Sequence, residues 1–354
     1  MSGFPRSPVL AVLLAPQRFL VLSPAEQGLL IQRARRQAVA GRLAAGLRHA
    51  GIWEELDAVA QAALAGIERR QRYREGLIRR ELDMLERDFL PAMAAPVVAL
   101  KGAAYLLRDL KAARGRVAAD VDLLVPEAAV DRASALLDEL GYVIAQEKDN
   151  PYDRRYYRVY MHEVAPRRHP IRDVELDLHF RLLPRTHRYA FAMDPIWERV
   201  RKLPGSAYDG LADADLFIHA AIHFLIDGEG REATRRLVEL YDLLDLWPDH
   251  KGARAAVMPR ARELGVASVL AAAFALLDEL EENLGDRSRR RITSAPLRLA
   301  RHALWRVQEE EEGGRPAPLA RRLLWLRGHL LRMPLPLLLR HLVTKWWRRR
   351  KAPA

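Results

Sequence analysis

The spacing of apolar residues changes twice along the chain, and this pattern constrains the fold more than any other feature. Up to about residue 92, apolar residues recur every three or four positions, which is typical of amphipathic helices. Short apolar or alternating runs then predict strands at 97–100, 120–125, 142–146, 156–164 and 172–180. Helical spacing returns at Asp213. We therefore expect an α/β fold of the α+β type, in which a small mixed sheet is flanked by helical N- and C-terminal regions.

The same pattern divides the chain into four parts. They are a helical N-terminal region at 1–92, an α/β core at 93–205, a helical C-terminal domain at 206–314 and a basic tail rich in Trp and Leu at 315–354. We expect helices at 24–50, 52–89, 102–110, 127–140, 213–226, 231–247 and 252–284. A capping box at Ser23 precedes the first of them. The acidic run at 309–312, followed by two glycines, predicts an exposed loop.

Composition excludes several classes of protein. The chain has 354 residues, half of them apolar, so a sizeable core is expected and global disorder is excluded. The absence of cysteine excludes disulfide frameworks, thiolate nucleophiles and Cys-zinc sites, and it suits a cytoplasmic protein. The apolar run from Pro8 to Pro16 is too short and too weakly basic at its start for a signal peptide, so we expect a helix packed on the fold. No run reaches the roughly 18 apolar residues that a spanning helix needs.

Two aspartates carry the clearest chemical signal. Asp120 and Asp122 are two apart on an expected strand, so both carboxylates point to one face of the sheet. Two carboxylates that close repel each other unless a cation lies between them. Oxygen ligands of this type favour Mg²⁺ or Mn²⁺, and pairs of such ions serve nucleotidyl transfer. For the two residues alone, a solvated strand end is an equally good interpretation.

Three further features strengthen the metal-site interpretation. Asp177 alternates with apolar residues on a later strand and shares a face with Glu175 and His179, so it would meet the paired aspartates if the two strands are neighbours. Upstream, Lys101-Gly102 joins an expected strand to a helix, and its glycine allows backbone N–H groups to approach a phosphate. Lys101 and Arg116 add positive charge for a triphosphate.

These residues together resemble the nucleotidyltransferase superfamily that includes DNA polymerase β, and most closely an uncharacterised bacterial branch of it. The matching positions are Leu100-Lys101-Gly102, Arg116, Asp120-Val121-Asp122-Leu123-Leu124-Val125 and Asp177-Leu178-His179. The resemblance implies transfer of a nucleoside monophosphate from an NTP, expected to be ATP, to an acceptor that it does not identify. It implies that the catalytic residues and ligands of Mg²⁺ or Mn²⁺ are Asp120, Asp122 and Asp177. The residues assigned to nucleotide binding are Lys101, Gly102, Ala103, Arg116 and His179.

Two other functions fit parts of the pattern. A catalytically degenerate member would bind nucleotide or a partner without turnover, as an antitoxin-like or scaffold protein. Ala103 favours this hypothesis, because the wider superfamily has Gly or Ser at that position. The presence of all three carboxylates, Asp120, Asp122 and Asp177, argues against it. A glycosyltransferase also uses Asp-x-Asp to bind Mn²⁺ and a nucleotide sugar, but it needs a preceding nucleotide-binding half of roughly 100 residues. Residues 1–90 have helical spacing, which argues against it.

His219 and His223 are one helical turn apart, with Asp215 a turn before them. This spacing suits a metal, but Ala220 stands where a zinc protease has Glu. We therefore favour a structural or supporting role for these residues.

Excess positive charge is concentrated at the end of the chain. Residues 286–354 contain 18 Arg or Lys and five Asp or Glu, whereas the whole chain has a net charge of +12. Leucines, Trp346 and Trp347 are interleaved with these cations. The tail therefore fits a packed helix with a basic end, a segment that binds an anionic membrane surface at its inner face, or a nucleic-acid contact.

Overall fold

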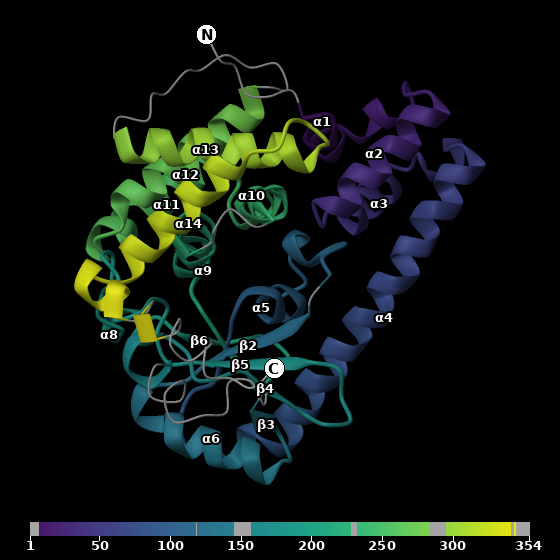
Figure 1. Ribbon diagram of the computed structural model, residues 1–354. Helices are drawn as coiled ribbons and strands as arrows, with labels where there is room; N and C mark the ends of the chain where they lie inside the picture. Colours follow the sequence, from purple (N-terminus) through teal and green to yellow (C-terminus); the bar gives the residue numbers. More distant parts are fainter. Residues whose placement is uncertain are drawn as a thin grey trace.

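The computed structural model describes residues 7–117, 119–144, 157–227, 232–282, 295–340 and 343–344. In these ranges it contains a mixed seven-strand sheet surrounded by helices, which confirms the expected α+β class (Figure 1). One continuous apolar core joins the sheet to the helices that precede and follow it in the sequence. None of the helices in this part of the chain combines the length and apolarity that a bilayer-spanning segment requires.

The strands of the sheet lie in the order β3-β4-β5-β2-β1-β7-β6. They are β1 (Val98–Ala99), β2 (Asp120–Leu124), β3 (Val143–Ile144), β4 (Arg167–Arg168), β5 (Glu175–His179), β6 (Arg201–Lys202) and β7 (Asp209–Gly210). The two longest strands, β2 and β5, are parallel neighbours. Val121, Leu123, Leu176 and Leu178 are fully buried on one face of these two strands, so the alternating acidic residues share the other.

Four α-helices precede the sheet in the described residues. They are α1 (Pro8–Leu14), α2 (Pro24–Arg36), α3 (Ala40–His49) and α4 (Ala58–Asp88). The capping box expected at Ser23 is confirmed, because the Ser23 side chain accepts from the Glu26 backbone N–H and Glu26 reaches back to the Ser23 N–H. The long helix α4 runs along one side of the molecule and packs against α2, α3 and β2 (Figure 1). These helices leave no nucleotide-binding α/β half before β2 in the residues described, which argues against a glycosyltransferase fold.

Further helices lie between the strands and after them. Those between the strands include α5 (Lys101–Leu107), α6 (Val130–Glu139) and α8 (Asp194–Trp197). Those after them include α9 (Asp213–Ile222), α10 (Ala233–Asp242), α11 (His250–Glu263), α12 (Ala267–Glu282), α13 (Ala295–Glu311) and α14 (Pro318–Arg332). Two helices expected to be continuous are each broken, at Ala38 and at Gly265, where φ is 57° and 72°. A residue with a positive φ ends a helix, but the helical spacing of apolar residues continues across the short turn that this residue forms. Spacing alone therefore does not mark these breaks.

One expected strand is wrong. Residues 157–160 are helical, and among the described residues of the expected strand at 156–164 only Glu163 forms a bridge, to His179. The physical reason is that β2 occupies one edge of β5, and β4 already pairs with the first part of the other edge. Residues 145–156 lie outside the described residues, so the end of the strand expected at 142–146 does too.

The acidic run at 309–312 is not the exposed loop that its composition predicts. Its first three residues belong to α13, and all four residues are partly buried. Glu310 pairs with Arg321 of α14 at 2.8 Å, and the Glu311 carbonyl accepts a hydrogen bond from Arg36. Contacts between distant segments therefore keep these acidic residues helical.

Two glycines bring the N-terminal helices close to the loop before β2. Gly41 of α3 lies against Gly115, and a Cβ atom on either residue would overlap with the backbone of the other. Gly115 also has a φ of 76°, which favours glycine. The crossing places α3 beside the loop that carries Arg116.

Candidate active site

Three carboxylates meet on one face of the sheet. Strands β2 and β5 are aligned so that Asp122 lies opposite Asp177, and Asp120 shares their face because it is two residues before Asp122. One ligand oxygen from each of the three carboxylates lies within 4.8 Å of the others. The structure therefore brings together Asp120, Asp122 and Asp177, as the shared strand faces predict.

Asp122 is the most enclosed of the three, with 1% of its side chain exposed. Its Oδ1 atom lies 2.6 Å from Lys101 Nζ and 2.9 Å from His179 Nε2. Burial alone would raise the pKa of Asp122, but the Lys101 ammonium and His179 hold it well below its ordinary value. Burial also opposes charge on Lys101, whose pKa is nevertheless raised by the Asp122 carboxylate. His179 is itself buried, so it contacts Asp122 rather than solvent.

The pKa of Asp177 is shifted in the opposite direction to that of Asp122. Its Oδ1 atom is buried and has no hydrogen-bond partner. Burial raises the pKa of Asp177 to about 9, and the nearby carboxylates of Glu163, Asp122 and Asp120 add to this shift. Burial and the Asp122 carboxylate also raise the pKa of Asp120. A divalent cation would provide the missing partner and relieve the repulsion, so this donor set fits Mg²⁺ or Mn²⁺.

The turn at the start of α5 differs from a simple phosphate cradle. The strained residue is Lys101, whose φ of 44° is rarely adopted by residues with a side chain. Gly102 lacks a side chain for another reason, since a Cβ atom there would overlap with the Arg116 guanidinium. The side chain of Ala103 is fully buried. The turn thus directs Lys101 to Asp122 and leaves room for Arg116 beside Gly102.

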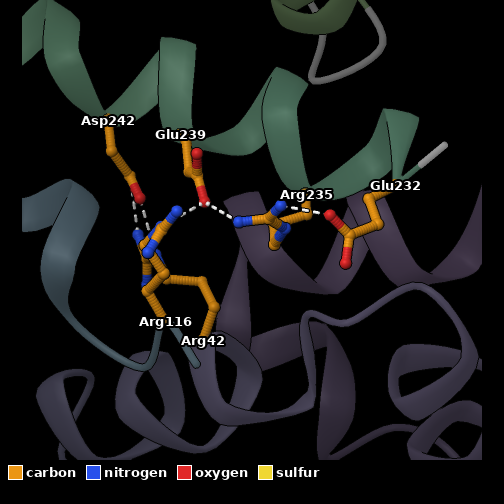
Figure 2. Close-up of polar contacts among 6 residues, drawn as sticks. All are labelled: Arg42, Arg116, Glu232, Arg235, Glu239 and Asp242. Atoms are coloured by element: carbon orange, nitrogen blue, oxygen red, sulfur yellow. Dashed lines mark hydrogen bonds and ion pairs between the residues drawn. The ribbon is translucent and has the colours of Figure 1, made fainter. Parts of the chain in front are cut away.

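Arg116 belongs to a row of charges along α10. Figure 2 shows Glu239 between two arginines, and its Oε1 atom lies 2.9 Å from both Arg116 Nε and Arg235 Nη1. One turn later, Asp242 accepts two hydrogen bonds of 2.8 Å from Arg42 of α3. The Nη1 atom of Arg116 is buried and has no hydrogen-bond partner. Arg116 is therefore held by Glu239 while one of its donors remains unused.

Glu163 and His162 join the site although the sequence did not indicate them. Glu163 bridges to His179, and its Oε2 atom lies 3.5 Å from His179 Nδ1. His162, Glu163 and His179 form a second group whose ligand atoms lie within 4.8 Å of one another. The sequence signal is Met161-His162-Glu163 in an alternating segment, and nothing in that segment identifies the strand it meets.

The spaced residues Asp215, His219 and His223 lie on α9 and on the π-helical turn that follows it. Asp215 is buried and pairs with Arg260 at 2.7 Å. His219 is buried too, and this burial, with the nearby Lys101 charge, holds its pKa well below the ordinary value. Neither group of potential metal ligands found in the described residues includes Asp215, His219 or His223. This arrangement agrees with the supporting role favoured from the sequence.

Comparison with known proteins assigns the chain to a family. A family model described as an uncharacterised nucleotidyltransferase matches residues 23–281. No curated protein matches the chain. The matched region begins just before α2, reaches the end of α12, and contains the whole sheet and the three carboxylates. Because the match covers well over half of its length, the chain belongs to this family of uncharacterised nucleotidyltransferases.

Proposed function

We propose that the protein is a metal-dependent nucleotidyltransferase that moves a nucleoside monophosphate from an NTP to an acceptor. The observation that carries this proposal is the meeting of Asp120, Asp122 and Asp177 on two parallel strands, with a buried Asp177 oxygen that has no partner. The family assignment supports the same class of reaction. We place the reaction in the cytoplasm, where nucleoside triphosphates are available.

The three carboxylates are the residues that would hold Mg²⁺ or Mn²⁺. When bound, such ions neutralise charge on the reacting phosphate and on the leaving pyrophosphate. Asp120 and Asp177 have raised pKa values, so their charged forms gain most from a cation. Asp122 is already paired with Lys101. Lys101 would become available to a phosphate group when Asp122 takes another cationic partner.

Arg116 and Lys101 are the groups that we assign to the triphosphate. A phosphate oxygen would satisfy the unused Nη1 donor of Arg116 with a charge-assisted hydrogen bond. Glu239 already orders the guanidinium, so less entropy is lost when the nucleotide binds. Because the Ala103 side chain is buried, any contact from that residue would come from its backbone. His179 would act through Asp122, as a positioning residue.

The proposed reaction follows from these placements. An acceptor oxygen forms a bond to the α-phosphorus, the bond from that phosphorus to the bridging oxygen breaks, and pyrophosphate leaves with the electron pair. The Asp177 carboxylate, which loses its own proton when the cation binds, would accept the acceptor proton and pass it to solvent. ATP is the donor to test first, because it is the most abundant NTP in cells.

The test combines the purified full chain, Mg²⁺, each NTP labelled at the α-phosphorus, and a cell extract as the source of acceptors. Wild-type protein should release pyrophosphate and yield a product heavier by one nucleotide. Asp120→Asn and Asp177→Asn should each slow both signals by about 100-fold or more. Glu175→Gln is the matched control, because Glu175 shares the face of β5 but pairs with Arg168. Equal activity in all the variants would refute the assignment.

One contact favours a second candidate function, nucleotide binding without turnover. The Lys101 ammonium lies 2.6 Å from Asp122 Oδ1, where it competes with a metal ion. A protein that keeps this pair would bind NTP in a metal-stimulated manner, as an antitoxin-like or scaffold protein, and release no pyrophosphate. Calorimetric titration with NTP, with and without Mg²⁺, combined with the pyrophosphate assay, distinguishes the two functions.

A further inference from the structure

Large apolar side chains are exposed on α14 and the residues after it. Sixteen large apolar residues are exposed in the described parts of the chain, and seven of them lie between residues 319 and 343. These seven, whose exposed fractions range from 40 to 77%, are Leu319, Trp325, Leu326, Leu330, Leu335, Leu339 and Val343. We call them the C-terminal surface. Single exposed apolar residues are common in proteins, but a concentration of this kind marks an interaction site.

The exposed residues of α14 lie opposite the side that packs on the protein. Leu324 and Gly328, four residues apart, are buried, and α14 packs against α13 and the π-helical turn at 223–227 (Figure 1). Leu326 and Leu330 follow these two residues by two positions each, which places them on the other side of the helix. Leu319 is two turns before Leu326 on that side. The helix therefore has two apolar sides, of which one is covered.

The charged residues of the segment that carries this surface have a single sign. Residues 313–354 contain eleven Arg or Lys and no Asp or Glu. Arg322 and Arg340 are exposed among the apolar residues. Arg321 and Arg327 have another role, since they bind Glu310 and the Leu225 carbonyl and thereby hold α14 on the protein. The outward face of α14 thus combines uncovered leucines with positive charge.

We propose that the C-terminal surface docks on the anionic face of a lipid bilayer. Leucine side chains would enter the boundary between headgroups and acyl chains, Trp325 would lie at headgroup level, and the arginines would contact lipid phosphates. A second copy of the chain would bring like charges together, and a nucleic acid would give the leucines no apolar partner. An anionic bilayer matches both properties of the surface. This proposal does not depend on the proposed enzymatic function.

Flotation of the full chain with vesicles tests the proposal. We expect binding to phosphatidylcholine vesicles that contain phosphatidylglycerol, and weaker binding to phosphatidylcholine alone. Changing both Leu326→Glu and Leu330→Glu should weaken binding to the anionic vesicles by about tenfold or more, because apolar contacts are lost and negative charges face lipid phosphates. Ile171→Glu is the matched control, since Ile171 is 90% exposed in the turn before β5 and should leave binding unchanged. Thermal unfolding checks that both variants remain folded.

Several results would overturn the proposal. They are an absence of vesicle binding at low salt, equal losses in the double variant and in Ile171→Glu, or a gel shift of RNA without any vesicle binding. Salt provides a second criterion, because the apolar part of bilayer binding persists at high salt whereas nucleic-acid binding falls steeply. A dimer in light scattering that the double variant converts to a monomer would instead assign this surface to self-association.

Discussion

Lys101 and Asp177 show how burial acts on opposite charges at the candidate site. Lys101 stays charged because the Asp122 carboxylate lies 2.6 Å away, whereas the charges that act most strongly on Asp177 are other carboxylates. Lys101 reaches Asp122 from a left-handed backbone conformation, which costs about 1–3 kcal/mol. Strain, repulsion between like charges and unused hydrogen-bonding atoms at one place are typical of a ligand site.

The raised pKa of Asp177 predicts how stability depends on pH in the absence of metal. The folded-state pKa is about 9 and the ordinary value is 3.8, so the stabilising effect of the proton is complete below the ordinary value and is lost as pH rises through the folded value. With EDTA present, wild-type protein should lose stability between about pH 5 and about pH 9, and Asp177→Asn should lose less. Thermal unfolding across this range measures the difference. Identical profiles for the two proteins would contradict the expectation, and Mg²⁺ should flatten the wild-type profile.

The Lys101–Asp122 pair predicts a large effect of removing one charge. Lys101→Met should lower the free energy of unfolding by about 3–5 kcal/mol without metal, because it leaves the buried Asp122 carboxylate without its cation. Mg²⁺ should restore part of this loss by binding only the folded state. Arg108→Met is the control, since its partner Asp213 is 48% exposed and the loss should stay below about 1 kcal/mol. Urea unfolding gives both values, and equal losses would argue against the role of Lys101.

At the scale of elements, α3 and α10 hold the loop that carries Arg116. Helix α10 supplies Glu239 to Arg116, and one turn later Asp242 to Arg42 of α3 (Figure 2). Burial alone would raise the pKa of Glu239, but Arg116 and Arg235 hold it below its ordinary value. Two helices far apart in the sequence therefore determine the position of one arginine at the site.

The glycine crossing between α3 and this loop predicts unequal effects of adding a methyl group. Gly115→Ala should lower the free energy of unfolding by about 1–3 kcal/mol, because the new Cβ would overlap with the backbone of Gly41 and the φ of 76° disfavours a side chain. Gly28→Ala in α2 should instead raise it by roughly 0.5–1 kcal/mol, since nothing lies within 4 Å of a Cβ there. Urea unfolding of both variants compares the two changes. A neutral Gly115→Ala would mean that the crossing is not tight.

At the scale of the whole molecule, the helical regions and the sheet share one core. Buried apolar residues from α1, from the central strands and from α14 belong to one continuous cluster. The ion pair between Arg42 and Asp242 connects positions 200 residues apart, and its carboxylate is 2% exposed. The C-terminal surface lies outside this core, because α14 uses its other side for packing. Docking through it would therefore leave the candidate site and its supporting helices unchanged.

The sequence by itself determined the local features. Alternation along 120–125 and 172–180 predicted β2, β5 and the shared faces of their carboxylates, because a strand turns successive side chains to opposite sides whatever its neighbours are. The capping box at Ser23 was predictable for a similar reason, since its two hydrogen bonds connect residues three apart. The α+β class followed from the order of these elements.

Only the tertiary structure decided which distant groups meet. That Asp122 lies opposite Asp177 depends on the order and register of strands, which the packing of the surrounding helices selects. Strand β4 pairs with the first part of β5, so residues 156–164 do not form the expected strand there. Glu163 instead forms a single bridge to His179 and thereby lies at the site. The close approach of Arg116 to Gly102 likewise needs Glu239 from α10. Contacts between residues far apart in the chain leave no periodic signal in the sequence, so local spacing does not reveal them.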